Sequence, residues 1–285
     1  MWWKVTLLII SGLIVAIGIA VLYGAARWRS GTKALRSQIE AAREHSAPTR
    51  YDARELTGLP APVQRYFRTV LKDGQPMVAA VSVRHTGTFN MSETGEQWKP
   101  FTSTQRVITR RPGFDWDGRL AMASGLAVHV HDAYVAGEGI LHAALLGLVT
   151  VVHMRGTPEV AQGELMRFLA EAAWYPTALL PGQGVRWEAV DDTLAKATLK
   201  DGDPAVTLLV RFCAAGPIQS IRAEARGRTV NGRVVATPWE GHWQHHELRD
   251  GMLVPLEGEV AWVLPEGPKP YWRGRITGID YGLAR

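Results

Sequence analysis

The sequence predicts an α+β protein, in which helices cover a curved antiparallel β-sheet that is not closed into a barrel, preceded by one transmembrane helix. Three observations predict this fold class. A long uncharged segment lies near the N-terminus, runs of alternating apolar and polar residues begin at about Val78, and tight-turn sequences separate these runs. Short strands joined by tight turns form an antiparallel meander with one covered side and one wet side.

Composition limits the class of protein. The chain of 285 residues is 46% hydrophobic and 21% charged, which suits a folded domain with a real core. Its formal net charge is +5, and a cationic protein beside a membrane is attracted to anionic lipid headgroups. No compact basic patch interleaved with aromatic residues is visible, so nucleic acid is not an expected partner. Cys213 is the only cysteine, which excludes an intrachain disulfide.

The first element is an uncharged segment from Val5 to Ala26. At about 1.5 Å per helical residue, it is long enough to cross the roughly 30 Å hydrocarbon core of a bilayer. The aromatic residues that flank it are typical of membrane interfaces: Trp2, Trp3, Tyr23 and Trp28. The alternative is a signal peptide cleaved near Gly24 or Ala26, but signal peptides have a shorter apolar region of about 7–15 residues. We therefore expect an uncleaved, single-pass helix over residues 5–26 in the cell (inner) membrane.

The charged residues that flank the uncharged segment indicate how it is oriented in the membrane. Only Lys4 precedes the segment, whereas four basic residues follow it: Arg27, Arg29, Lys33 and Arg36. The positive-inside rule then favours a cytoplasmic soluble domain. We interpret residues 27–58 as a helical juxtamembrane connector. Within it, residues 32–45 are predicted to form a short solvated helix, and Ser46 to Arg50, which contains a proline, is predicted to be a linker.

Residues 59–285 form the predicted β-rich soluble domain, which begins with a helix in the string LPAPVQRYFRTVLKDG. Pro62 suits the first helical turn, and Asp73 with Gly74 ends the helix. Its apolar residues recur at the spacing of one buried helix face: Val63, Tyr66, Phe67, Val70 and Leu71. We expect this helix to pack on the domain as a lid or brace.

A period of two marks the strands, most clearly in the strings VTLLVRFC, IQSIRAEAR and EVAWVL. The residues that share a face within these runs are Val206, Leu208, Val210, Phe212, Ile221, Ala223, Ala225, Val260, Trp262 and Leu264. Turn sequences separate the runs: Asp201-Gly202-Asp203-Pro204, Gly216-Pro217, Asn231-Gly232, Asp250-Gly251 and Pro265-Glu266-Gly267. We expect the region from about residue 78 onward to form a single, mostly antiparallel sheet.

Two insertions with helical character interrupt the predicted meander. The run from Gly139 to Met154 is almost wholly apolar and too short to span a bilayer comfortably, so it is interpreted as a buried helix or a mixture of strand and helix. The second insertion begins with Thr157 as an N-cap and Pro158 at the first helical position, and Pro176 stops it. Its apolar face consists of Leu165, Phe168, Leu169 and Ala172.

Common catalytic and metal-binding signatures are absent. The chain has no G-x-S-x-G, no P-loop, no G-x-G-x-x-G opening a helix, no H-E-x-x-H and no C-x-x-C. His129 and His131 share a strand face, and a later cluster comprises His242, His245 and His246. Imidazoles on facing strands can hold zinc or iron, but exposed strand histidines are the favoured interpretation. We expect no bound metal and no cofactor.

Four carboxylates are candidates for chemistry or for ion pairs. Asp115 and Asp117 share a strand face, as an acid–base pair would, although two solvated acids at a strand edge is the favoured interpretation. Asp132 lies among apolar neighbours and needs a partner, either Tyr134 or an arginine. Glu171 follows Arg167 by four residues, and an ion pair between them would explain it.

Tryptophan is abundant, with eleven in the chain. Its large ring fills a core or lines an apolar cavity, and its N–H seeks a hydrogen-bond partner. The segment from Glu164 to Pro181 is the candidate for one wall of a ligand site, because Trp174-Tyr175-Pro176 places two rings on a stiffened turn. The candidate ligand-binding residues are Trp116, Asp132, Tyr134, Phe168, Glu171, Trp174, Tyr175, Trp239 and Trp262.

Several strings resemble a family of bacterial membrane-anchored proteins known only as a domain of unknown function. They are LPAPVQRYFR, PGFDWDGRL, DAYVAGEG, ELMRFLAEAAWYPTALLP, TPWEGHW and YWRG, and the likeness runs from about Leu59 to the C-terminus. The family implies no catalytic residues. A second resemblance, of fold only, is to lipoprotein carriers of the LolA and LolB type. It implies a curved antiparallel sheet whose helices cover a cavity for acyl chains, and it favours a periplasmic domain, so the membrane side stays open.

The leading hypothesis is a non-catalytic protein that binds a lipid or other apolar ligand at the membrane surface. One alternative is a membrane-anchored hydrolase or metal-dependent enzyme that uses Asp132, Glu171 and the histidines. Another is a structural partner of a second envelope protein. An elongated apolar cavity favours the first, converging acids and histidines favour the second, and a large exposed apolar patch favours the third. The sequence leaves the ligand and the oligomeric state open.

Overall fold

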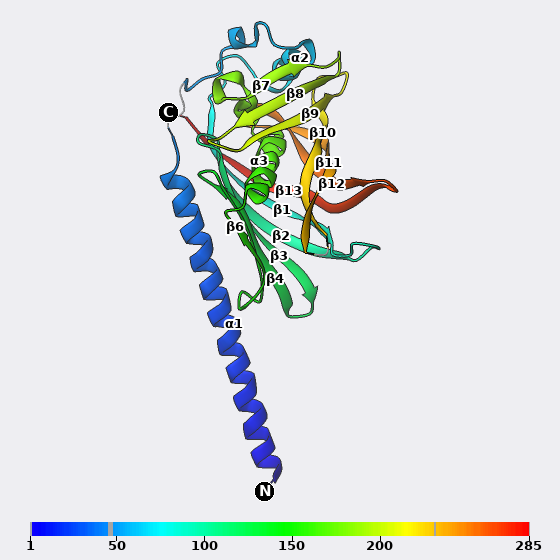
Figure 1. The fold of residues 1–285 in the computed structure, drawn as a ribbon. Coiled ribbons are helices and arrows are strands. Elements are labelled where there is room, and N and C mark those ends of the chain that lie inside the picture. The colour runs from blue at the N-terminus through cyan, green and yellow to red at the C-terminus, as the bar shows by residue number, and fades with distance from the viewer. Residues whose placement is uncertain (1, 45–47, 231, 285) are drawn as a thin grey trace.

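The computed structural model describes residues 2–44, 48–230 and 232–284, and in this part of the chain thirteen strands form one sheet (Figure 1). Each strand pairs antiparallel with its neighbours. The strands are β1 (Val78–Asn90), β2 (Trp98–Ile108), β3 (Gly113–Ala123), β4 (Leu126–Val135), β5 (Glu138–Leu145), β6 (Val149–Arg155), β7 (Arg186–Ala189), β8 (Leu194–Lys200), β9 (Ala205–Phe212), β10 (Ile218–Val230), β11 (Arg233–Arg249), β12 (Met252–Leu264) and β13 (Gly267–Leu283).

The sheet is curved and open. Its strand order is β6-β5-β4-β3-β2-β1-β13-β12-β11-β10-β9-β8-β7, so β6 and β7 are the two free edges. β1 pairs with β13 and joins the two halves of the sheet. Helix α3 follows β6 and precedes β7, and it crosses the concave face between the two edges (Figure 1). The predicted fold class, a curved antiparallel sheet that is not closed and is covered by helices, is confirmed.

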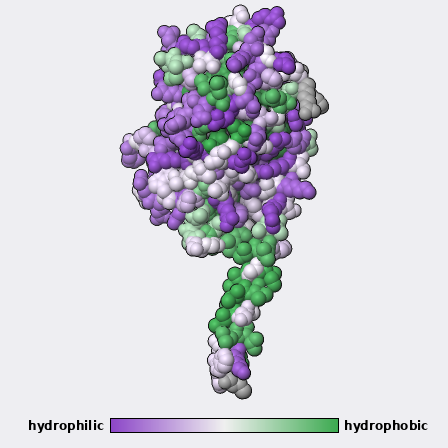
Figure 2. Space-filling model, turned by 180° about the vertical axis from the view of Figure 1, so that it is seen from behind, coloured by the Kyte–Doolittle hydropathy of each residue, from purple (hydrophilic) through white to green (hydrophobic). Residues whose placement is uncertain are grey.

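Helix α1 (Trp2–Ala41) is one uninterrupted helix of 40 residues. Its N-terminal part projects from the domain as an apolar rod (Figure 2), and it is the one helix among the described residues that is long and apolar enough to cross a membrane. Its C-terminal part lies against the convex face of the sheet, where Thr32 and Ile39 are buried. The prediction of a separate, solvated helix over residues 32–45 is therefore wrong, because residues 32–41 belong to α1 and pack on the sheet. Residue 45 and the first two residues of the predicted linker, 46 and 47, lie outside the described residues.

Helix α2 (Ala61–Val70) forms where the sequence predicts it, after a short 3-10 turn η1 (Ala53–Leu56). Pro62 lies in its first turn, and the chain leaves the helix toward Gly74, whose positive φ of 76° a glycine adopts easily. All five residues of its predicted apolar face are buried in the main core: Val63, Tyr66, Phe67, Val70 and Leu71.

Helix α3 (Pro158–Glu171) also matches its predicted start and face. The Thr157 side chain accepts a hydrogen bond from the backbone N–H of Val160, which caps the helix. Leu165, Phe168, Leu169 and Ala172 are all buried. Three short 3-10 turns then lead to β7: η2 (Ala172–Trp174), η3 (Pro176–Leu179) and η4 (Pro181–Gln183).

The apolar run from Gly139 to Met154 was predicted to be a buried helix or a mixture of strand and helix. This prediction is wrong: the run contains no helix and contributes most of β5 and β6. The reason is that β5 has both faces covered. Ile140 lies in a cluster with Ile39 of α1 on the convex side, and α3 contacts β5 on the concave side. A strand buried on both faces loses the period of two and looks like a short buried helix.

The predicted turns join consecutive strands of the second half of the sheet. Gly202, Gly216, Gly251 and Gly267 all have positive φ at these turns; Asn231 lies outside the described residues. One predicted alternation fails at Ala225, which is exposed, because a bulge between Ala223 and Arg226 shifts the register of β10 against β11.

Candidate functional site

A group of charged and amide side chains is enclosed between α3 and the concave face of the sheet. We call it the Arg167 cluster, and its members are Gln105, Asp132, Glu164, Arg167 and Glu171. Arg167 Nη1 donates to Asp132 Oδ2 at 2.5 Å, and Arg167 Nε donates to Glu171 Oε1 at 2.7 Å. Gln105 Nε2 donates to the other oxygen of Glu171 at 2.6 Å. The predicted Arg167–Glu171 pair is therefore present, and the arginine partner that Asp132 needs is also Arg167.

Local sequence places these groups together. Glu164, Arg167 and Glu171 are spaced by three and four residues, so they share one face of α3. Asp132 and Trp116 lie opposite each other on β4 and β3, and Gln105 pairs with Trp116 on β2. In a strand every second residue faces the same side, so this row points into the concave face toward α3.

Burial governs the charge of the cluster. Burial opposes the charge of Arg167, but Glu171 and Asp132 outweigh it and hold the pKa of the guanidinium above its ordinary value. Burial raises the pKa of Glu164 well above its ordinary value, and the negative charge of Asp132 raises it further. Arg167 forms its ion pairs with Asp132 and Glu171, and Glu164 is the third carboxyl group beside it.

Four buried polar atoms of this region have no hydrogen-bond partner among the described residues: Gln105 Oε1, Trp116 Nε1, Asp132 Oδ1 and Glu164 Oε2. Most buried polar atoms in folded proteins are hydrogen-bonded, because leaving one unpaired costs about 1–3 kcal/mol. These four atoms surround Arg167. A second set of unpaired atoms lies in the same core, at His85 Nε2, Trp174 Nε1 and Trp243 Nε1.

Aromatic rings line the concave face beside the Arg167 cluster. We call them the aromatic group, and its members are Phe89, Phe101, Trp116, Trp239, Trp262, Tyr271 and Trp272. Phe101 lies between Trp116 and Trp272, with ring centroids 5.7 and 5.8 Å away. Tyr271 stacks on Trp262 at 5.6 Å and accepts a hydrogen bond from Trp239 Nε1 at 2.9 Å. Phe89, Trp262, Tyr271 and Trp272 are only partly buried, so this apolar surface reaches solvent.

Two arginines of β10 lie over this group. The Arg226 guanidinium is 5.0 Å from the centre of the Trp239 ring, and that of Arg228 is 5.9 Å from the Trp262 ring. Both side chains are half-buried. Neither forms an ion pair with a carboxylate in the part of the chain that the structure describes. Guanidinium groups above aromatic faces, with their N–H donors free, can bind a carboxylate or phosphate by donating hydrogen bonds to it.

The structure brings together some of the predicted site residues and separates others. Trp116, Asp132 and Glu171 meet at Arg167, and Trp239 and Trp262 meet at Tyr271. The remaining four lie elsewhere in the core: Tyr134 donates to Asp201 Oδ2 at 3.0 Å, Trp174 packs on His85 and Trp243, and Tyr175 packs on Phe168 and donates to its carbonyl oxygen. Sequence reasoning missed Gln105, Glu164, Arg226, Arg228 and Tyr271, because their patterns are those of solvated strand and helix positions.

Comparison with known proteins identifies the family of the domain. Residues 57–281 match the model of a family of unknown function, DUF6920. The chain belongs to the DUF6920 family. The match covers α2, α3 and nearly all of the sheet, and it excludes α1. Both the Arg167 cluster and the aromatic group thus lie within the DUF6920 domain, and the resemblance to a domain of unknown function is confirmed.

Among solved structures, a LolA superfamily protein from Nitrosomonas europaea is similar to this chain. The likeness covers 78% of this chain and 94% of that chain, with 10% sequence identity and a TM-score of 0.34. A comparison with curated proteins gave no match.

The convex face of the DUF6920 domain carries a second polar site, where α1 packs on the sheet. Asp115 Oδ2 accepts from Arg36 Nε at 3.0 Å, and Asp117 accepts from Trp28 Nε1 at 2.9 Å and Thr32 Oγ1 at 3.0 Å. Asp115 is completely buried, and burial raises its pKa to about 7 although Arg36 opposes the shift. The prediction of two solvated acids at a strand edge is wrong, because α1 covers this part of β3.

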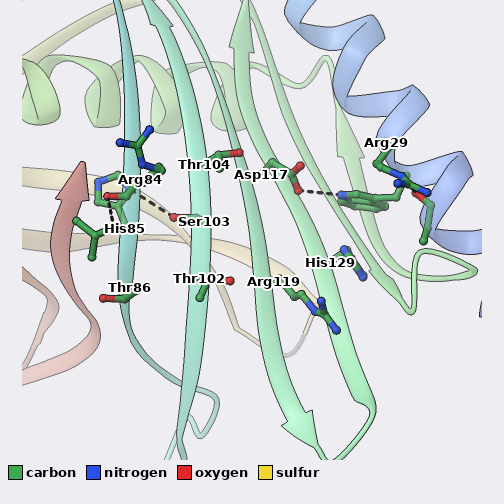
Figure 3. Close-up of a pocket in the computed structure, with 13 residues that line it drawn as sticks. Arg29, Arg84, His85, Thr86, Thr102, Ser103, Thr104, Asp117, Arg119 and His129 are labelled. Carbon is green, nitrogen blue, oxygen red and sulfur yellow. Dashed lines mark hydrogen bonds between the residues drawn. The ribbon is translucent and has the colours of Figure 1, made fainter. Parts of the chain in front are cut away.

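An open groove of about 560 Å³ runs between α1 and this face of the sheet. Its lining comes from α1, from β1 to β4 and from β13, and Figure 3 labels Arg29, Arg84, Thr102, Thr104, Arg119 and His129 among these residues. Three arginines, Arg29, Arg84 and Arg119, line this groove, whereas aromatic rings line the concave face.

Histidines surround Trp28 at the same junction. Trp28 stacks on His131 with 4.0 Å between centroids, and His129 and His142 lie 5.4 and 5.2 Å away. His129 and His131 do share a face, as predicted, but His131 is buried rather than exposed. The later histidines lie beside acids, His242 at 3.4 Å from Glu240 and His245 at 3.1 Å from Glu257. No group of three or more potential metal ligands occurs among the described residues.

The acids and histidines named for the enzyme hypothesis lie on opposite sides of the sheet. Asp132 faces α3, whereas His129 and His131, on the same strand, face α1. The sheet backbone separates Asp132 from these two histidines, so the three residues do not converge on one pocket.

Proposed function

We propose that α1 spans a membrane and that the DUF6920 domain binds an anionic amphiphile, such as a fatty acid or an acidic lipid, on its concave face. The observation that carries the proposal is the position of Arg226 and Arg228 over Trp239 and Trp262. They are half-buried cations with no carboxylate partner among the described residues, beside an apolar surface that reaches solvent.

The aromatic group is the proposed site for the hydrocarbon part of the ligand. Rigid rings offer a large apolar contact area and lose little conformational entropy when a ligand binds. Phe89, Trp262, Tyr271 and Trp272 are partly exposed, and covering them would remove apolar surface from water, at about 25 cal/mol for each Å². Arg226 and Arg228 would then hold the acidic head through charge-assisted hydrogen bonds.

The Arg167 cluster has a different part in this proposal. Arg167 is already matched by Asp132 and Glu171, so it has little capacity to hold a further anion. We propose that the Arg167 cluster holds α3 on the sheet, and that α3 in this position closes one end of the concave face. Binding and stability are therefore expected to depend on different arginines.

The division of the chain supports a membrane location. The proposed span covers residues 5–26, residues 27–58 connect it to the domain, and residues 59–285 form the ligand-binding domain of a single-pass protein of the cell (inner) membrane. Because α1 continues without a break onto the convex face of the sheet, the connector holds the domain at a fixed position above the lipid. The side of the membrane is left open.

Uptake of a dansyl-labelled fatty acid by the full chain in nanodiscs tests the proposal, with energy transfer from tryptophan as the signal and empty nanodiscs as the background. We expect the double variant Arg226→Gln, Arg228→Gln to weaken binding about tenfold or more, because each charge-assisted hydrogen bond contributes about 1.5–3 kcal/mol. Arg273→Gln is the matched control, since Arg273 also covers a tryptophan, Trp98, at 4.4 Å but is paired with Glu259. Equal uptake by all three proteins would refute the proposal.

A further inference from the structure

The hairpin between β5 and β6 touches α1 close to the end of its uncharged segment. Leu146, Gly147 and Leu148 form the tip, and they pack on Gly24 so closely that a Cβ at Gly24 would lie 2.4 Å from the Leu146 carbonyl oxygen. A Cβ at Gly147 would lie 2.7 Å from the carbonyl oxygen of Gly24. Arg27 Nη1 also donates to the Leu148 carbonyl at 3.4 Å. The glycine pair therefore fixes the height of the tip along α1.

That height coincides with the proposed membrane boundary. Gly24 lies two residues before Ala26, the last residue of the uncharged segment, which is a distance of about 3 Å along a helix. If α1 spans the bilayer, the hairpin tip lies where the hydrocarbon core meets the headgroups. Arg27 and Arg29 follow directly and lie at the level of the lipid phosphates.

The surface of β6 suits that position. Val149 and Val151 are each 62% exposed, and the strand from Val149 to Arg155 contains no acidic residue. β6 is also a free edge of the sheet, and natural proteins protect or cover an exposed aliphatic edge strand because it invites aggregation. Figure 2 shows apolar side chains gathered where α1 leaves the domain.

We infer that the β5–β6 hairpin tip and the exposed valines of β6 insert into the lipid interface, so that the bilayer covers this edge of the sheet. The inference rests on the proposed membrane span of α1 and is independent of ligand binding on the concave face. The domain then has two fixed attachments to the membrane, the helix and the hairpin, which sets its tilt as well as its height.

Single-cysteine labelling of the full chain tests this inference in a Cys213→Ser background. An environment-sensitive NBD probe is placed at Val151 or Val149 on β6, at Ile14 within the proposed span, or at Leu248. Leu248 is the matched control, an exposed aliphatic residue (63%) next to the β11–β12 turn, where the Asp250 carbonyl accepts from Gln75 far from the hairpin. The proteins are reconstituted in nanodiscs with and without doxyl lipid, a mixture that places quenchers both near the headgroup and near the end of the acyl chain. It therefore reaches the interface as well as Ile14, which lies about 15 Å deeper than Gly24 along the helix.

We expect the doxyl lipid to quench the probes on Val149 and Val151 at least twofold more than the probe on Leu248. Quenching at Ile14 together with values at Val149 and Val151 equal to that at Leu248 would overturn the hairpin inference and leave the membrane span standing. An unquenched Ile14 probe would overturn both.

Discussion

The part of the sheet formed by β3 and β4 lies between α1 and α3, and charged groups are buried differently on its two faces. On the convex face, α1 brings separate groups to separate acids, with Arg36 at Asp115 and the Trp28 N–H at Asp117. On the concave face, one arginine of α3, Arg167, pairs with Asp132 of β4 and with Glu171 of its own helix, and burial raises the pKa of the neighbouring Glu164. Arg36 is about one-third exposed, whereas Arg167 is largely enclosed. Water can therefore compensate a loss on the convex face far better than on the concave face.

The largest effect is expected from removing Arg167. Arg167→Met leaves Asp132 and Glu171 buried without their cation, and breaking a buried pair from one side typically costs about 3–5 kcal/mol of unfolding free energy. Arg36→Met should cost clearly less, because the pKa of Asp115 is already raised to about 7 and this acid can take up a proton. Denaturant unfolding of the full chain in detergent measures both values. Equal costs would contradict the distinction between the two faces.

A second large effect concerns Trp174, which the sequence assigned to the wall of a ligand site. The structure buries it, 2% exposed, against His85 and Trp243. Trp174→Ala should therefore destabilise the fold by about 3 kcal/mol or more, as other large core truncations do, and leave fatty-acid affinity unchanged in the folded protein. Unfolding and dansyl-lipid titration on one preparation separate the two roles. A small stability loss with weakened uptake would show that Trp174 lines the ligand site.

A buried histidine on the convex face should also make the free energy of unfolding decrease at acidic pH. Burial lowers the pKa of His131 to about 4, with Asp117 opposing the shift and His142, Arg36 and His129 adding to it. The unfolded chain binds this proton more readily, so the stabilising contribution is complete above about pH 6.5 and is lost as pH falls toward 4. The loss amounts to about 3 kcal/mol.

Unfolding free energies between pH 4 and 8 check this step. His131→Gln should make the acidic limb less steep. It should not abolish it, because burial also lowers the pKa of His85, to about 3, and this imidazole loses stability over the same pH range. Asp115→Asn is the control of opposite sign, because the raised pKa of Asp115 lowers stability as pH rises toward 7. An unchanged acidic limb in the His131 variant would show that this imidazole is not held neutral by its burial.

The smallest predicted effect isolates one hydrogen bond between α1 and the sheet. Trp28→Phe keeps most of the stacking on His131 but removes the donor to Asp117. A hydrogen bond to a charged group contributes about 1.5–3 kcal/mol, and because Asp117 keeps its bond from Thr32, we expect a loss near the lower end. Thermal unfolding of Trp28→Phe and wild type provides the comparison. A change below about 0.5 kcal/mol would mean that stacking alone holds α1 here.

Much of this fold could be predicted from local patterns. The turn sequences and the alternation from Val206 to Phe212 identify an antiparallel meander, and Thr157 with Pro158 identifies the start of α3. Each of these signals depends on neighbours within a few residues, so no tertiary information is needed to interpret it. The same holds for Arg167 and Glu171, which are one helical turn apart.

The convex face could not be predicted because its determinants are distant in sequence. The alternation of β3 shows that Asp115 and Asp117 share a side, but not that a helix some 80 residues earlier covers them. β5 illustrates the opposite error, since burial by α1 and α3 together removed its alternation. Arg226 and Arg228 have the pattern of a solvated strand face, and only the pairing of β10 with β11 and of β11 with β12 places them over Trp239 and Trp262.

Native mass spectrometry of the full chain, extracted in mild detergent, tests most directly whether the concave face holds an anionic amphiphile. The account predicts that the wild-type protein and Arg273→Gln each retain one co-purified amphiphile, seen as a single added mass. The Arg226→Gln, Arg228→Gln double variant should be recovered mainly without it. A wild-type protein with no added mass, or a double variant that retains the ligand as fully as wild type, would contradict the account.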